Sequence, residues 1–401
     1  MIKLKDILNQ NSTGKFMTGS KLIRESRRSI KLIFVESALT NFLMFMPVIW
    51  LIYADVGLSQ FDIGIAQAFF AITMLVTMVP TGYIADRFSR KLSNMSGDLL
   101  MVAGLLTYAL GASLPVFILA EVLFALGLSL TRGADKALLK AHCSVAKKDY
   151  SKTNSRLESV NFTLQGLGAV AGGILGVQNI RWPLLATAGM VMLGFFASTM
   201  IKNAGKKRET DLHPLRDISN IVRYCLKRDS KLAWRIFLGA SLLGSTWMIV
   251  WLLTPLFLQS GISVGWHGVL FAVISIAAIA GSELARKVKI PMALPLLITG
   301  LAYLVLGLHV SIFTVFLYLV TSFSRGINTA KVQPYIQEVV PEDIQATALS
   351  VFDMSYRVFT IVLGLSVNFL ASINLQYGFG FAAAFSFLCF GVFTISARKY
   401  E

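Results

Sequence analysis

Long apolar runs and short polar segments alternate along almost the whole chain. Each run holds about 20 residues, which as an α-helix is long enough to cross a bilayer core of roughly 30 Å. The runs are continuously apolar, which excludes the alternating strands of a transmembrane barrel. The pattern therefore predicts an all-α membrane protein with twelve transmembrane helices. We expect these helices over residues 31–53, 62–81, 93–112, 114–139, 153–177, 182–201, 232–258, 267–285, 292–308, 312–331, 344–370 and 379–397.

The predicted helices form two sets of six, separated by one hydrophilic stretch. Within that stretch apolar residues recur at helical spacing from Leu215 to Cys225, with basic residues between them. An amphipathic helix on the inner leaflet and a solvated linker both fit this pattern. The predicted organisation is an N-terminal tail at 1–29, a bundle at 30–201, a linker at 202–231, a second bundle at 232–397 and a C-terminus at 398–401.

The two sets share an internal repeat. Thr131-Arg132-Gly133 in the fourth predicted helix recurs as Ser324-Arg325-Gly326 in the tenth. The spacing is close to half of the chain length, and a polar loop with an acidic residue follows each copy. A repeat of this period indicates two six-helix halves inserted in the same orientation.

Composition and charge agree with a membrane location. Hydrophobic residues make up 55% of the chain and charged residues 14%, whereas soluble proteins average about 45–50% and about 25%. The formal net charge is +16, yet only Arg181 lies in a loop that we expect outside. Arg132, Arg325 and Arg357 lie within predicted helices, and the other basic residues lie near the inner face. This asymmetry predicts a cell (inner) membrane protein with both termini cytoplasmic, and no nucleic-acid partner.

Several classes of chemistry find no support in the sequence. The three cysteines lie in or near predicted cytoplasmic or membrane segments, so we expect no disulfide. The four histidines lack metal-ligand spacing, and no glycine-rich phosphate loop with a lysine is present. Residues 1–29 have no apolar core, so we expect no cleaved signal peptide. We predict a protein that is not an enzyme and that needs neither a cofactor nor a metal.

Residues 82–91 read Gly-Tyr-Ile-Ala-Asp-Arg-Phe-Ser-Arg-Lys and join the second and third predicted helices. This segment resembles the loop between helices 2 and 3 of the major facilitator superfamily, a large class of secondary transporters. Ser89 stands where a second glycine is usual. The resemblance implies two pseudo-symmetric six-helix bundles. The residues that match the motif are Gly82, Asp86, Arg87, Arg90 and Lys91.

The resemblance also implies that this segment is a latch at an inner gate. In the family, the aspartate that matches Asp86 faces the start of helix 11, here residues 345–347. It also joins a relay with the residues that match Arg90 and Asp135. Loss of such a latch would shift the equilibrium between two access states. The alternative is a topology signal, in which the cations only orient the loop.

A glycine run in the fifth predicted helix bears on the direction of transport. It resembles the motif that marks antiporters of the superfamily, and Gly168, Gly172 and Gly173 match it, whereas Ala169 replaces the proline. Glycines let two helix backbones approach closely and would seal a seam between the halves. Ordinary helix packing explains the run equally well, but the resemblance implies export.

Acidic residues within apolar runs are candidates for proton coupling, because an ionisable group at bilayer depth is costly. We single out Glu36, Glu121, Glu158 and Asp353. Burial favours the neutral form of a carboxyl group, and a nearby cation favours the charged form. Asp353 and Arg357, one helical turn apart, also suit a permanent structural pair. Glu121 has no cation nearby in its own helix, so it is the first choice.

Basic and aromatic residues within the predicted helices are candidates for the inner gate and for the substrate cavity. Arg132 and Arg325 would pin the inner gate or bind an anionic group, and their repeat favours the gate. Aromatic surfaces accommodate varied apolar ligands, although in membrane helices they also serve as packing or interfacial anchors. The candidates for the substrate cavity are Asn41, Trp247, Trp251 and Arg357.

These features predict a monomeric secondary active transporter that works by alternating access in the bilayer. Its partners would be a small-molecule substrate and protons. The first hypothesis is proton-coupled efflux of small amphipathic, drug-like or antibiotic-like compounds. The alternatives are a proton-coupled symporter that imports a nutrient, a lipid flippase on the same scaffold, and a transport-dead sensor.

Overall fold

The computed structural model describes residues 19–87, 89–203, 230–340 and 345–400, without the side chains of 19, 79, 82–84, 86, 87, 133, 230, 333, 345–348, 350 and 396–400. The elements in these ranges are helical. The first group comprises α1 (Gly19–Thr40), α2 (Ile49–Asp55), α3 (Gln60–Arg87), α4 (Arg90–Leu110), α5 (Leu114–Ala146), α6 (Tyr150–Gln178) and α7 (Trp182–Met200). The second group comprises α9 (Ser230–Trp247), α10 (Leu253–Gln259), α11 (Val264–Lys287), α12 (Ala293–Leu308), α13 (Leu317–Gln337), α14 (Gln345–Ile373) and α15 (Leu375–Tyr400), with short 3₁₀ turns at Val250–Leu252 and Thr314–Phe316.

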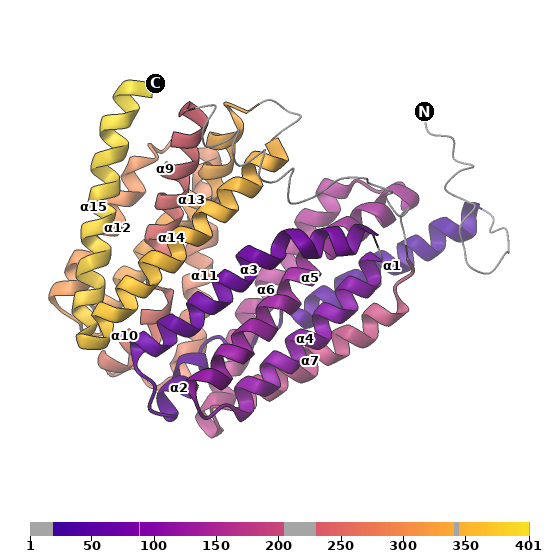
Figure 1. Ribbon diagram of the computed structural model, residues 1–401, viewed down its shortest axis with the longest axis horizontal. Coiled ribbons are helices and arrows are strands. Elements are labelled where there is room, and N and C mark those ends of the chain that lie inside the picture. The colour runs from indigo at the N-terminus through magenta and orange to yellow at the C-terminus, as the bar shows by residue number, and fades with distance from the viewer. Residues whose placement is uncertain (1–18, 88, 204–229, 341–344, 401) are drawn as a thin grey trace.

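The two groups stand side by side, converge near α2 and α10, and diverge toward the opposite end (Figure 1). Helix α3 packs against α14, and α6 packs against α11, so four helices form the junction between the groups. We call the end with residues 41–59 and 260–263 the predicted outer end. The end with residues 147–149 and 288–292 is the predicted inner end.

The first predicted helix, over residues 31–53, is wrong as a continuous element. It is divided into α1 and α2, and Pro47 lies in the irregular segment between Thr40 and Ile49. Proline has no backbone N–H to donate and disfavours helix at the residue before it, which accounts for the break. The seventh predicted helix is divided into α9 and α10 by the 3₁₀ turn at Val250–Leu252, in a segment that contains no proline.

Both breaks lead into turns of the same design. Gly57 follows α2 with φ of 78°, and Gly261 follows α10 with φ of 76°. These are left-handed conformations that end a helix and that glycine adopts without strain. The two groups therefore share a local plan at the predicted outer end, as the sequence repeat near their middle indicates.

Eight helical segments in the described ranges are long and apolar enough to cross a membrane, and one of them, Lys231–Gln259, runs through α9 and α10. The predicted helices at 31–53, 93–112, 292–308 and 312–331 are not among them. Helix α12 is apolar but shorter, and charged residues lie within α1, α4 and α13. Twelve spanning helices therefore stay a prediction.

Buried apolar side chains fill the region beside the break in the first group. Phe45 and Ile49, from the break and the start of α2, lie in one cluster with Leu105 of α4 and Phe117 of α5. The ring centroids of Tyr53 and Phe117 are 4.6 Å apart. This packing holds the short helix α2 over the interior of the group and directs Tyr53 inward.

Candidate functional site

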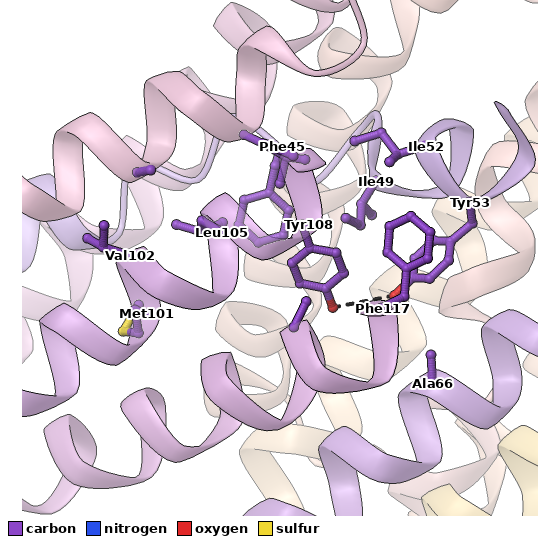
Figure 2. Packing of buried hydrophobic residues seen from close by; sticks show 14 of the residues in the cluster. Phe45, Ile49, Ile52, Tyr53, Ala66, Met101, Val102, Leu105, Tyr108 and Phe117 are labelled. Carbon is purple, nitrogen blue, oxygen red and sulfur yellow. Dashed lines mark hydrogen bonds between the residues drawn. The ribbon is translucent and has the colours of Figure 1, made fainter. Parts of the chain in front are cut away.

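The carboxyl group of Glu121 lies at the meeting point of four helices. Tyr53 of α2 donates a hydrogen bond of 2.9 Å to Glu121 Oε1, and Gln67 of α3 donates to the same oxygen. The Tyr53 hydroxyl also lies 3.4 Å from that of Tyr108 in α4, and Figure 2 shows the two phenol groups meeting beside Phe117. Glu121 is only 3% exposed. A carboxyl group with neutral partners in this setting can hold or release a proton without breaking an ion pair.

A second group of carboxylates lies nearer the predicted inner end. Glu36 of α1 and Asp98 of α4 are 1% and 0% exposed. Asn94 donates to Glu36 Oε1 at 3.3 Å and to Ser198 Oγ at 3.1 Å, and Ser198 donates to Asp98 Oδ2 at 3.5 Å. We call Glu36, Asp98 and Asp135 the inner acid cluster, because Asp135 of α5 interacts electrostatically with both other acids.

The inner acid cluster is under-satisfied. Glu36 Oε2 and Asp98 Oδ1 are buried and have no hydrogen-bond partner in the described part of the chain. Three nearby acids repel one another when they are charged. The amide of Asn94 and the hydroxyl of Ser198 link Glu36 to Asp98. These hydrogen bonds leave one oxygen of each carboxyl group without a partner among the described residues.

Glu158 and Asp353 have different surroundings from the buried acids. Glu158 forms a salt bridge of 3.4 Å with Lys136, and these two side chains are 40% and 62% exposed. Asp353 is half-buried and interacts electrostatically with Arg357 and with Arg132 of the first group. The described residues include no salt bridge between Asp353 and Arg357, so these two side chains interact without the close contact of an ion pair.

The structure separates the residues assigned to the substrate cavity. The guanidinium carbon of Arg325 lies 4.8 Å from the ring centroid of Trp247. Trp251, by contrast, lines a small pocket at the predicted outer end with Trp50. Asn41 donates to the Ser37 carbonyl at 2.8 Å and accepts a 3.3 Å bond from Gln165.

Contacts between the two groups at the predicted outer end come from residues that the sequence does not single out. Gln60 of α3 donates a 2.6 Å bond to Asn368 Oδ1 of α14 and a 3.2 Å bond to the Trp251 carbonyl. Trp50 donates to Gln60 Oε1 at 2.6 Å. These hydrogen bonds form a cross-group clamp that links the two groups at this end.

The glycine run of α6 has two packing roles. A Cβ at Gly173 would lie 2.9 Å from the backbone nitrogen of Gly268 in α11, which is too close for any other residue. Here α6 and α11 meet across the junction between the groups. Gly168 and Gly172 instead face the backbone of residues 42–44 within the first group. The seam expected from the sequence thus depends on Gly173.

The expected latch lies mostly outside the described residues. The side chains of Gly82, Asp86, Arg87 and residues 345–347 are not described. At its edge, Arg90 donates to the Ala137 carbonyl of α5 at 3.5 Å, and Lys91 donates to the Thr199 carbonyl of α7. Ser89 is in an extended conformation and caps α4 by accepting a 3.3 Å bond from the Leu92 N–H, so this position does not require glycine.

Sequence reasoning missed several residues of these sites. Asp98 lies inside a predicted helix, and its charge was a usable signal. Tyr53, Gln67 and the Gln60–Asn368 pair gave none, because nothing in one sequence shows that residues 54 to 308 positions apart share a polar contact. The predicted linker helix at 202–231 lies almost entirely outside the described residues.

A Major Facilitator Superfamily model matches residues 33–365. The chain belongs to this superfamily. It is a family of transporters rather than of enzymes. An uncharacterized transporter, BU466, of Buchnera aphidicola subsp. Acyrthosiphon pisum is 26% identical over 225 residues. The match covers 53% of each chain, so this chain spans about half the length of that curated relative.

Solved structures of transporters share the fold at low sequence identity. The nucleoside transporter NupG superposes with a TM-score of 0.75 at 13% identity, with 94% of this chain and 100% of NupG covered. The peptide transporter POT in complex with sulfate has a TM-score of 0.73 at 13% identity, with coverage of 96% and 99%. A bacterial homologue of the lysosomal transporter Spinster, described as inward-facing and unoccupied, has a TM-score of 0.66 at 14% identity, with coverage of 95% and 97%.

Proposed function

We propose that this superfamily member is a proton-coupled secondary transporter of a small molecule, in which carboxyl groups of the first helix group exchange the coupling protons. The observation that carries the proposal is the setting of Glu121. Its carboxyl group is buried and accepts hydrogen bonds from the hydroxyl of Tyr53 and the amide of Gln67. Both partners suit either protonation state of Glu121, because a hydroxyl can donate or accept and a glutamine amide has both a donor and an acceptor group.

The inner acid cluster supplies a second group of carboxyl oxygens closer to the inner face. Glu121 and Glu36 lie on different helices and at different depths, so protons can be taken up and released at separate levels. A change between an outer-closed and an inner-closed arrangement would expose them in turn. The hydrogen bond between Gln60 and Asn368 supports the proposal that the structure is in the outer-closed state.

For the direction of transport we propose efflux of small amphipathic compounds, and the support is the glycine run of α6. Gly173 sits at the α6–α11 junction, where the antiporter motif is implied to act. Import of a nutrient is the second candidate, because Ala169 replaces the proline of that motif. Fold neighbours that carry nucleosides and peptides are compatible with import.

The test of proton-coupled efflux is a toxicity screen in a pump-deficient host. We expect the parent chain to raise resistance to one or more compounds and the E121Q variant to lose this effect at equal membrane abundance. E283Q is the matched control, because Glu283 is exposed and pairs with Arg286. Alkalinisation of the medium by energised cells on addition of a nutrient would instead assign import. If neither response occurs with the parent chain, the proposal is wrong.

A further inference from the structure

Three arginines and one aspartate surround Tyr356 where the two helix groups face each other. Tyr356 of α14 interacts electrostatically with Arg325 of α13 and with Arg357 and Asp353 of its own helix. From the first group, Arg132 of α5 interacts electrostatically with Tyr356, Arg357 and Asp353. We call Arg132, Arg325, Asp353, Tyr356 and Arg357 the central basic cluster.

The cluster carries three positive charges and one negative charge. Among the described residues none of its arginines forms a salt bridge, and Arg357 Nε is buried without a hydrogen-bond partner. Charged groups within a membrane protein normally pair with one another or line a pathway. Asp353 offsets one charge. Glu158 and Lys136, which interact electrostatically with Arg132 and Asp353 respectively, form a salt bridge with each other and add no net charge, so the cluster favours an additional anion.

The chemistry of the side chains narrows the kind of anion. A guanidinium group presents a planar fork of donors that matches a carboxylate or a phosphate. Arg325 lies over the Trp247 ring, which is 40% exposed. An apolar or planar portion of a ligand can lie against this ring while the arginines hold its charged group.

The position of the cluster couples binding to the movement of the two groups. Arg132 belongs to the first group and Arg357 to the second, and their like charges repel. A bound anion between them replaces this repulsion with two attractions. Closing the groups around the cluster is then easier with the anion present than without it, which is the differential affinity that drives a change of state.

We propose that the transported molecule is a small organic anion, bound through a carboxylate or phosphate group by Arg132, Arg325 and Arg357 with its apolar portion against Trp247. This inference rests on the proposed transport function and names its substrate class. The rival role of the same residues is a pin of the inner gate, which involves no ligand.

The test measures anion binding to the purified full-length chain in phosphatidylcholine nanodiscs. The probes are phenyl phosphate and benzoate, with benzylamine and benzyl alcohol as cationic and neutral controls, and the readouts are the shift in unfolding temperature and calorimetric titration. We expect one or both anions, and neither control, to stabilise the protein. Arg132→Gln and Arg357→Gln should each lower the affinity for the anion by about tenfold or more.

Two controls separate this inference from general effects. Arg286→Gln removes an exposed cation outside the cluster and should leave anion binding unchanged. Glu283→Gln, at the exposed partner of that arginine, should also leave it unchanged. Anion binding is measured without a pH gradient and proton coupling by gradient-driven transport, so failure of one is distinguishable from failure of the other. Nanodiscs that contain phosphatidylglycerol identify the source of the anion. Competition by that lipid would assign the arginines to a lipid headgroup, whereas unchanged probe binding would assign them to a soluble anion.

Two results would overturn the proposal. In the first, no probe anion stabilises the parent chain, or the cationic probe does so equally. In the second, anion stabilisation persists in full in both Arg132→Gln and Arg357→Gln. A gate pin alone predicts the second result, because it would change stability without the ligand and not the anion dependence.

Discussion

The two helix groups share a plan but bury different charges. In the first group Glu36, Asp98 and Glu121 are nearly or completely inaccessible. In the second group the partly buried charges that meet at Tyr356 are those of Arg325, Arg357 and Asp353. The contrast suggests that the first group exchanges the protons, whereas the second group supplies two of the three arginines that we propose hold the cargo.

The largest effect is expected from Glu121→Gln, which tests the proton side of this contrast. Glutamine keeps the size and one acceptor oxygen for Tyr53 but cannot exchange a proton. We expect transport driven by a pH gradient in proteoliposomes to fall to the level of empty vesicles, while counterflow without a gradient persists. Full gradient-driven transport by the variant would remove Glu121 from the coupling mechanism.

A leucine at Gly173 tests the junction across which the groups communicate. The new Cβ would lie 2.9 Å from Gly268 N, so α6 and α11 must separate. Overpacking of this kind costs about 1–3 kcal/mol. We expect the outer-closed state to be destabilised by this amount relative to the outer-open state. Spin-label distances across this end should lengthen. Gly189→Leu is the control, because a Cβ there meets no atom within 4 Å.

Asp98→Asn tests whether the buried acids of the first group lower the stability of the fold. The change removes one charge from the inner acid cluster and keeps an acceptor for Ser198. We expect the free energy of unfolding to rise by about 1–3 kcal/mol, the usual penalty of an unsatisfied buried group, in a denaturant titration of the purified protein. Asp55→Asn, at a partly exposed ion pair, should change it by less than about 1 kcal/mol. Destabilisation by Asp98→Asn would show that the charged form is favoured.

Gln60→Ala removes the side chain that bridges the two groups at the predicted outer end. It loses the bonds to Asn368 and to the Trp251 carbonyl, and the net effect of one such bond is about 1 kcal/mol. Loss of one bond corresponds to a roughly fivefold shift toward an outer-open state and loss of both to about thirtyfold, visible as faster labelling of a cysteine placed at residue 61. Gln178→Ala, on the exposed end of α6, should not change the labelling rate.

The smallest effect is expected from Glu158→Gln. Its salt bridge with Lys136 is largely exposed, and such pairs contribute about 1 kcal/mol or less. Transport coupling and stability should therefore stay close to those of the parent chain. A strong loss of coupling would return Glu158 to the set of proton-exchanging residues and would widen the contrast between the two groups.

Much of the fold could be predicted from the sequence because the apolar runs set the helices. The break between α1 and α2 could not be seen in hydrophobicity alone, although Pro47 was a local signal for it. The same limit applies to α9 and α10, where the run stays apolar through the 3₁₀ turn.

Some acids of the candidate site could be predicted from the sequence, but their hydrogen-bond partners and their arrangement could not. An acid in an apolar run identifies Glu36 or Glu121, since burial of such a group is costly. Its partners come from other helices, and their rotation is set by packing that the sequence does not reveal. Tyr53 shows this well, because it reaches Glu121 only after the chain has broken at Pro47 and turned α2 inward.

The most direct test of the central claim is an infrared pH titration of the carboxylic acid band in the purified full-length chain, compared with Glu121→Gln and Glu283→Gln. The account predicts a titrating band from a carboxyl group in an apolar setting that is missing in Glu121→Gln and unchanged in Glu283→Gln. An identical set of titrating bands in the parent chain and in Glu121→Gln would contradict it.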